Sequence, residues 1–337
     1  MITTKTISRL FSGFNDLNVL IIGDVMVDAY LWGKVERISP EAPVPIVTVE
    51  KRENRLGGAA NVGLNVKSLG ATVYICAVIG KDQKGTEFLE LLDHEGISKQ
   101  GIVQSDKRVT TTKFRVIGNN TQMLRVDEEH TQPLDNEVAS SLNLNIKNLV
   151  DQEKIDVIIF QDYDKGVITS SLIEEIVLLA NARKIPVVVD PKKANFLNFK
   201  NVTLFKPNLK EIKDGLNIEF DENDDSELEK AISLLQESVN AHIVLNTLSE
   251  KGVFVRWNEN GEFKSEKILA HFRNISDVSG AGDTVISVAA LCLAYGTDVV
   301  DMAAIANLSG GIVCEEVGVV PINKTKLHDE VIRLLTK

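Results

Sequence analysis

The chain has 337 residues, of which 44% are hydrophobic and 25% are charged, and its mean hydropathy is +0.01. This composition is that of a folded globular protein rather than a disordered or membrane-embedded chain. With 37 lysine and arginine residues against 48 aspartate and glutamate residues, the net charge is −11. We therefore expect neither nucleic acid nor a membrane as a partner, and a local site for any anionic ligand.

Short β-branched runs alternate with helix-length segments along most of the chain. Strands are predicted over residues 19–23, 72–79, 155–160, 186–189, 202–205 and 242–246. Helices are predicted over residues 59–69, 84–95, 134–150, 170–183, 227–238 and 285–295. The alternation predicts an α/β fold with a doubly wound, mostly parallel sheet that has helices on both faces.

Two segments, residues 28–50 and 101–126, break this alternation. The first holds three prolines, and the second reads as two strands around a Gly-Asn-Asn turn. Because neither is followed immediately by a crossover helix, we expect a small β-sheet that projects from the core, with an ordinary edge hairpin as the alternative. Such a sheet would act as a lid, and its outer face would pair two subunits. With no internal repeat or linker, residues 1–337 are expected to form one domain.

Several features bear on location and on metals. The amino terminus is too polar for a signal peptide and the apolar run at 285–295 is too short to cross a bilayer, so we expect a cytoplasmic protein. Cys76, Cys292 and Cys314 lie in apolar segments without CxxC spacing, which predicts buried free thiols. The five histidines never fall at metal-ligand spacing, so no zinc site is expected. The acidic stretch 221–229 is interpreted as a solvated loop and helix start.

The strongest chemical signal is the segment DVSGAGDT at residues 277–284. Gly280, Ala281 and Gly282 at a helix entrance leave backbone N–H groups uncovered, and the helix dipole adds partial positive charge, which favours a phosphoryl group. Asp283 in the same turn would then accept a proton from an alcohol aligned with that group. Alternatively, Asp283 only complements the helix dipole and the glycines only turn the chain. These residues alone leave both interpretations open.

Two common nucleotide-binding patterns are absent from the sequence. No GxxxxGK[ST] string occurs, which excludes a Walker-type phosphate site. The glycines at 57–58 and 280–282 do not form GxGxxG after the first strand, which argues against an NAD-binding enzyme.

DVSGAGDT resembles the carboxyl-terminal signature of the ribokinase/PfkB carbohydrate kinases, and LGGAANV at residues 56–62 resembles their amino-terminal glycine signature. Within this family the chain is most similar to the D-glycero-β-D-manno-heptose-7-phosphate kinases of lipopolysaccharide precursor synthesis, through segments such as RISPEAPVPIV, QDYDKG, VVDPK and KPNLKE. The similarity covers residues 18–320. It implies a ribokinase-like fold with a β-sheet lid, transfer of phosphate from ATP with Mg²⁺ to O1 of the heptose, and a homodimer through the lid. A monovalent cation is a further candidate cofactor.

The resemblance also implies roles for individual residues. Asp283 would be the base, with Gly280, Ala281 and Gly282 as the anion hole. Asn208 and Glu211 would steer Mg²⁺ through water, although their spacing also satisfies a helix cap. The nucleotide-binding residues implied are Asn208, Leu209, Lys210, Glu211, Thr247, Ser249, Gly252 and Asn307.

A phosphorylated sugar needs hydroxyl contacts and a cationic clamp. The candidate substrate residues are Asp28, Gly57, Gly58, Asn61, Arg55, Lys113, Arg115, Arg125, Asp162, Lys165, Asp190 and Lys192. Which of the cations contacts phosphate is not readable from the sequence. Each would alternatively be solvated or paired with a neighbouring acid.

The sequence departs from the family pattern at two places: Ser279 replaces the usual threonine, and Gly318-Val319 stands where the heptose kinases often have Gly-Thr. Many relatives carry a fused nucleotidyltransferase, and for a chain ending at Lys337 we expect that activity from another protein. The alternatives are a kinase for another sugar or sugar phosphate, and a catalytically idle protein that senses sugar or nucleotide.

Overall fold

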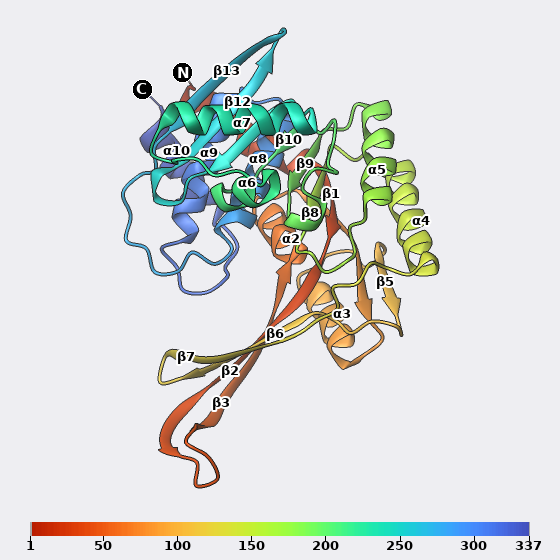
Figure 1. Ribbon diagram of the computed structural model, residues 1–337, viewed down its shortest axis with the longest axis vertical. Coiled ribbons are helices and arrows are strands. Elements are labelled where there is room, and N and C mark those ends of the chain that lie inside the picture. Colours follow the sequence, from red (N-terminus) through yellow and green to blue (C-terminus); the bar gives the residue numbers. More distant parts are fainter. Residues whose placement is uncertain (1, 337) are drawn as a thin grey trace.

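The computed structural model describes residues 2–336 and confirms the predicted α/β fold class (Figure 1). Seven neighbouring strands of the large sheet are parallel and two at one edge are antiparallel. The order across this nine-stranded sheet is β13 (Glu262–Ile268), β12 (Val253–Glu259), β11 (Ile243–Thr247), β10 (Leu204–Phe205), β9 (Val187–Asp190), β8 (Val157–Gln161), β1 (Asn18–Gly23), β4 (Thr72–Gly80) and β5 (Ile102–Ser105).

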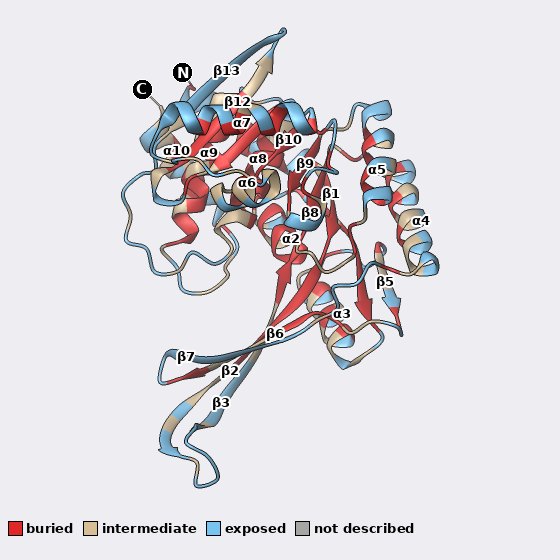
Figure 2. Ribbon diagram, in the orientation of Figure 1, coloured by how far each residue is buried: buried red, intermediate tan, exposed pale blue. Residues whose placement is uncertain are grey.

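Helices cover both faces of this sheet and bury two separate cores, so the strands are buried on both sides (Figure 2). In β1, Val19 and Ile21 point into one core, while Leu20 and Ile22 point into the other. The first core is covered by α1 (Thr4–Gly13), α2 (Ala59–Ser68), α3 (Gln83–His94), α8 (Ala281–Tyr295), α9 (Val299–Val313) and α10 (Lys324–Leu335). The second is covered by α4 (Asn136–Gln152), α5 (Ser170–Arg183), α6 (Leu209–Leu216) and α7 (Asp225–Val239).

A second, four-stranded sheet projects from the body, as Figure 1 shows. Its order is β3 (Pro45–Gly58), β2 (Val25–Ile38), β6 (Thr112–Gly118) and β7 (Thr121–Glu128). We call it the small sheet. Asn119 and Asn120 have φ of +51° and +62°, the conformation of a tight hairpin turn, so the predicted Gly-Asn-Asn turn is confirmed. Because β2 pairs with both β3 and β6, this is a separate sheet and not an edge hairpin.

The boundaries predicted for the small sheet need correction. Residues 102–105 form β5, which pairs in parallel with β4 of the large sheet, because α3 precedes it as a crossover helix. The remaining strands also extend past the predicted ends, to Gly58 and Glu128.

Other predicted elements agree with the structure within a few residues. α5 spans the predicted residues 170–183, and the Thr169 hydroxyl accepts from the Leu172 N–H as its cap. α8 starts four residues before the predicted position, at Ala281. The acidic stretch is a loop in which Asp224 caps α7. All three cysteines are free and buried, as predicted. Among residues 2–336, no helix is long and apolar enough to span a membrane.

Candidate active site

Most of the predicted site residues lie at the carboxyl edge of the parallel strands, where ligands bind in doubly wound sheets. β8 ends at Gln161, β9 ends at Asp190, β11 ends at Thr247, and Lys206 directly follows β10. The amino-terminal half of α8 meets this edge, since α8 contacts both β8 and β9.

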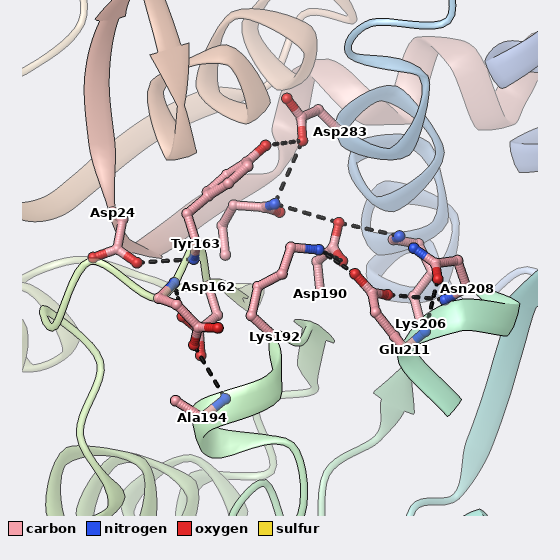
Figure 3. Close-up of polar contacts among 12 residues, drawn as sticks. Asp24, Asp162, Tyr163, Asp190, Lys192, Ala194, Lys206, Asn208, Glu211 and Asp283 are labelled. Atoms are coloured by element: carbon pink, nitrogen blue, oxygen red, sulfur yellow. Dashed lines mark hydrogen bonds and ion pairs between the residues drawn. The ribbon is translucent and has the colours of Figure 1, made fainter. Parts of the chain in front are cut away.

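Asp283 lies buried in the first turn of α8, and its carboxylate accepts hydrogen bonds at both oxygens. Asn61 Nδ2 donates to Oδ2 at 2.7 Å. The Tyr163 hydroxyl donates to Oδ1 at 2.7 Å (Figure 3). Gln161 Nε2 lies 3.4 Å from the same Oδ1. Burial raises the pKa of Asp283 to about 6, while the bonds from Asn61 and Tyr163 oppose that rise. A carboxylate with such a pKa is suited to accept a proton from an alcohol.

The backbone around the start of α8 offers free donors beside this carboxylate. Gly280 is the N-cap with φ of +80°, a conformation that favours glycine. The Ala281 N–H bonds at 3.3 Å to the Val278 carbonyl. Within the described chain, the N–H groups of Gly280, Gly282 and Asp283 have no partner. Gly282 and Asp283 belong to the first turn of α8, so their N–H groups at the positive end of the helix are available as anion-binding donors.

A chain of buried charges continues from this helix end (Figure 3). Lys206 Nζ lies 3.1 Å from Asp190 Oδ2, and both side chains are buried. Lys192 pairs with Glu211, and its Nζ is 3.9 Å from Asp190 Oδ1. A Cβ atom placed on Gly282 would stand 3.7 Å from Lys206 Nζ, so this cation lies beside the free N–H groups of α8. The Lys206 ammonium and its partner Asp190 Oδ2, which is 3.9 Å from the same Cβ position, thus both border the start of α8.

Asn208 and Glu211 form a reciprocal capping box at the start of α6. Asn208 Oδ1 accepts from the Glu211 N–H at 2.9 Å, and Glu211 Oε2 accepts from the Asn208 N–H at 2.9 Å. Asp190 Oδ1 is buried without a hydrogen-bond partner among the described residues. Residues 2–336 contain no cluster of three His, Cys, Asp or Glu side chains that would hold a metal alone. Mg²⁺ usually binds only one or two protein carboxylates and completes its coordination with water and substrate phosphates. The few carboxylate oxygens beside this candidate phosphate site therefore fit Mg²⁺.

The other predicted nucleotide residues surround the end of β11. Thr247 bridges to Asn208 and so lies beside the start of α6. Ser249 and Gly252 follow in a tight turn, with φ of +54° and +98°. Asn307 of α9 donates to the Leu269 carbonyl at 3.0 Å, beyond the end of β13. In the first turn of α6, Leu209 is partly buried and Lys210 is exposed.

The predicted sugar contacts converge on one face of the small sheet. Asp28 is buried and pairs with Arg115, and Asp28 is aligned with both Arg55 and Lys113 in the neighbouring strands. Arg55 reaches the body of the protein, where its Nη1 lies 3.4 Å from the Val319 carbonyl. We call the face that carries these residues the polar face.

Gly57, Gly58 and Asn61 join the polar face to the base. A Cβ on Gly57 would lie 2.3 Å from Asp28 Oδ2, so only glycine allows this carboxylate to approach. Gly58, with φ of +61°, is the N-cap of α2. This helix carries Asn61 to the Asp283 carboxylate.

Three further predicted substrate residues already have protein partners, and one of them, Arg125, lies on the polar face, aligned with Arg115. Arg125 is half-exposed and pairs with Asp127 at 3.0 Å. Lys165 pairs with Glu129 at 2.9 Å. Asp162 is buried in the loop after β8, where it accepts from the Asp164 N–H at 2.8 Å and from an asparagine amide. Burial raises the pKa of Asp162 to about 7.

Sequence reasoning missed four residues of the site: Asp24, Gln161, Tyr163 and Lys206. Tyr163 lies in the segment QDYDKG, and Lys206 directly precedes Pro207 at the end of a buried strand. A polar residue directly after a parallel strand was the available signal, because such positions point into the ligand-binding edge.

Together, a free helix amino terminus, a buried carboxylate with a raised pKa and an adjoining cation define a kinase that phosphorylates an alcohol. Residues 16–326 match the model of the pfkB family carbohydrate kinases. The chain therefore belongs to the pfkB family and is a sugar kinase.

Curated relatives agree with the family assignment. The bifunctional protein HldE of Geobacter sulfurreducens is 37% identical over 327 residues, which cover 96% of this chain and 64% of that protein. HldE of Helicobacter pylori J99 is 37% identical over 89% of this chain and 63% of its own length. The chain thus spans less than two thirds of these relatives.

The solved structures share the fold at low sequence identity. Phosphofructokinase-2 from Escherichia coli, in complex with potassium, has a TM-score of 0.77 and 17% identity, with 95% of this chain and 99% of that chain covered. Ribokinase from Arabidopsis thaliana, complexed with ribose and ATP, has a TM-score of 0.69 and 15% identity, with 93% and 98% covered. The ribokinase-like fold is therefore confirmed.

Proposed function

We propose that the protein transfers the γ-phosphoryl group of MgATP to O1 of D-glycero-β-D-manno-heptose 7-phosphate, giving ADP and the 1,7-bisphosphate for ADP-heptose synthesis. The observation that carries the proposal is the buried Asp283, held between the free N–H groups of α8 and a polar face rich in cations. The similarity to HldE proteins supports the choice of sugar. A substrate that already carries a phosphate also suits the cations of the small sheet.

In this mechanism the sugar O1 attacks the γ-phosphorus in line with the bond that breaks to the β-phosphate oxygen. Asp283 accepts the proton of the O1 hydroxyl. The N–H groups of Gly282 and Asp283, with the Lys206 ammonium beside them, stabilise the negative charge on the transferring oxygens. We place the nucleotide phosphates along Asn208 to Glu211 and Thr247, which are neighbours through the bridge between Asn208 and Thr247.

Magnesium would be held mainly by the nucleotide phosphates and water, with Glu211, Asn208 and the unpartnered Asp190 Oδ1 nearby. When bound, it neutralises phosphate charge. A monovalent cation remains a candidate, since the phosphofructokinase-2 structure contains potassium.

Lys113 is our candidate for the cation that holds the 7-phosphate. It is half-buried on the polar face, 5.8 Å above the Tyr163 ring, and no carboxylate lies within 4 Å of its ammonium in the described chain. Burial lowers the pKa of Lys113, as expected for a lysine without a close partner. By contrast, Arg115 is paired with Asp28 and Lys192 with Glu211.

The test is ADP release on a panel of sugars with and without a terminal phosphate. We expect turnover of the heptose 7-phosphate and weak turnover of the unphosphorylated heptose. Lys113→Met should raise KM for the phosphorylated sugar by about 10- to 100-fold, the effect of losing one charge-assisted contact, and change KM for the unphosphorylated sugar little. Lys230→Met, which removes an exposed lysine of α7, is the matched control for KM of the sugar.

The same panel separates the two alternatives. Turnover of another sugar would keep the mechanism and discard the heptose. ATP binding without phosphorylation of any sugar would favour a sensing protein.

We also propose that two copies pair through the small sheet. The face opposite the polar one carries Leu31, Phe114, Val116, Leu124 and Val126, which the strand register places on one side. Leu124 and Val126 are 56% and 49% exposed. An apolar sheet face of this kind is typical of an interface between subunits.

Replacing Leu124 and Val126 together with aspartate should convert a dimer of twice 37.1 kDa into a monomer. Pairing would bury the two new carboxylates away from water. The free energy needed to desolvate them exceeds the free energy that burying these side chains contributes. Light scattering after size-exclusion chromatography measures the mass. Leu178→Asp, at a leucine of α5 that is 62% exposed, is the matched control and should leave the mass unchanged. A monomeric wild-type protein would contradict the proposal.

A further inference from the structure

The buried carboxylate of Asp24 holds the loop between β8 and α5 in place. Asp24 is the residue that links β1 to β2. Asp24 Oδ2 accepts from the N–H groups of Tyr163 at 2.8 Å and Lys165 at 3.2 Å, and Oδ1 accepts from that of Val167 at 3.2 Å. Three backbone donors on one carboxylate fix the path of the loop. The position of the Tyr163 Cα is thereby set by the point where the small sheet leaves the body.

The same loop is tied on its other side to the segment after β9. Asn195 Nδ2 donates to Asp162 Oδ2 at 3.2 Å. The Ala194 N–H donates to Asp164 Oδ1 at 3.2 Å (Figure 3). Tyr163 is therefore anchored by both neighbours, which fixes the direction in which its Cα–Cβ bond points.

That direction is toward Asp283. The Tyr163 hydroxyl donates to Asp283 Oδ1 at 2.7 Å, and its ring lies between Lys113 and Lys192, whose Nζ atoms are 5.8 and 5.9 Å from the ring centroid. Burial, with the charges of Asp283 and Asp190, raises the pKa of Tyr163 well above its usual value. The hydroxyl thus keeps its proton and acts as a donor.

We propose that Tyr163 is a positioning residue for the catalytic base: together with Asn61 it holds the Asp283 carboxylate in one orientation and leaves a lone pair on the carboxylate free for the sugar hydroxyl. Each carboxylate oxygen has two acceptor sites. Tyr163 and Gln161 donate to Oδ1 and Asn61 donates to Oδ2, so one site on Oδ2 stays free. This inference rests on the proposed role of Asp283 as base, but not on the identity of the sugar.

The hydrogen bond also stabilises the ionised form of Asp283. The other charged groups around Asp283 are Asp190, which raises its pKa, and Lys206, which lowers it. Lys192 lies near as well, through its contact with Asp190. Gln161 and Asn61 are neutral donors. Removing the Tyr163 hydroxyl leaves all of these groups in place, so a change in the pKa of Asp283 reports the loss of one hydrogen bond.

The experiment compares wild type with Tyr163→Phe, which keeps the ring between the two lysines. The acid limb of the kcat/KM profile should move upward by about one pH unit, the value of one hydrogen bond to a charged group. From a pKa of about 6, this shift lowers the ionised fraction at pH 6 from about one half to about one tenth, a fivefold loss of rate. Titration of Asp283 by carbon NMR of the aspartate side chains, assigned with Asp283→Asn, should give the same shift without any substrate.

Tyr295→Phe, at the far end of α8, is the control and should change neither readout. An unshifted Asp283 titration in Tyr163→Phe would overturn the inference. A shifted titration in a protein that phosphorylates a different sugar would sustain it and reject only the heptose. A shifted titration with an unmoved acid limb would show that Asp283 is not the base, and the positioning role would be withdrawn.

Discussion

Replacing Asp283 with asparagine is expected to lower kcat by about 10³-fold, because the sugar hydroxyl loses its proton acceptor. The amide keeps the shape of the carboxylate and can still accept from the Tyr163 hydroxyl. On the other side, Asn61 Oδ1 has no partner among the described residues, so the Asn61 amide can rotate and accept from the new NH₂ group. The substitution therefore removes the base without creating a void, although the rotated Asn61 NH₂ group gives up its present acceptor.

The same variant should be more stable than the wild type at neutral pH. Burial raises the pKa of Asp283 from 3.8 to about 6, so the native state binds a proton more tightly than the unfolded chain does. Asp283 therefore destabilises the fold progressively as pH rises from about 4 to 6, by up to about 3 kcal/mol above that range. An asparagine does not ionise. The gain in Tm should be large at pH 8 and small at pH 4.

Measured together, the rate and Tm separate loss of chemistry from loss of folding. An inactive variant with a raised Tm supports the assignment of Asp283 as base. A variant that keeps more than about one tenth of wild-type kcat would contradict it, since a general base contributes at least about 10² in rate.

The second large effect is expected at Lys206. Lys206→Met keeps the length of the side chain and removes the charge beside the free N–H groups of α8. We expect kcat to fall by about 10²-fold, as for loss of one group that stabilises the transition-state charge. The fold should also lose about 3 kcal/mol, because Asp190 would remain buried without its close cation.

A double variant distinguishes the two effects of Lys206. In Lys206→Met with Asp190→Asn, no uncompensated charge remains, so much of the lost stability should return. The rate should stay low, because the cation near the phosphoryl group is still missing. Urea unfolding and steady-state kinetics report the two quantities. Recovery of kcat in the double variant would mean that Lys206 acts only by neutralising Asp190.

Features determined by one short segment could be predicted from the sequence, whereas features that depend on residues far apart in the chain could not. The helix start at Gly280 to Asp283 is local, so its glycines and acid could be recognised from one short segment. The bond between Tyr163 and Asp283 joins residues 120 positions apart and depends on where Asp24 holds the loop. Nothing in the segment QDYDKG alone specifies that partner.

Some elements were missed because the patterns that predict them are absent. α9 is apolar around most of its surface, and its buried residues, such as Met302, Ile305 and Leu308, do not leave a clear polar stripe. The small sheet was predicted, but its two faces could not be assigned. Bulges between Trp32 and Gly33 and between Val35 and Arg37 shift the alignment of β2 with β3.

The central place of β1 affects how the protein is made on the ribosome. β1 is paired on one side with β4 and on the other with β8, so the middle of the sheet cannot close until residue 161 has left the exit tunnel. α1, which precedes all the strands of the large sheet, packs against α10, which follows all of them. The nascent chain therefore exposes apolar strands throughout much of translation, and shielding of the growing chain by chaperones would decide its yield in a cell.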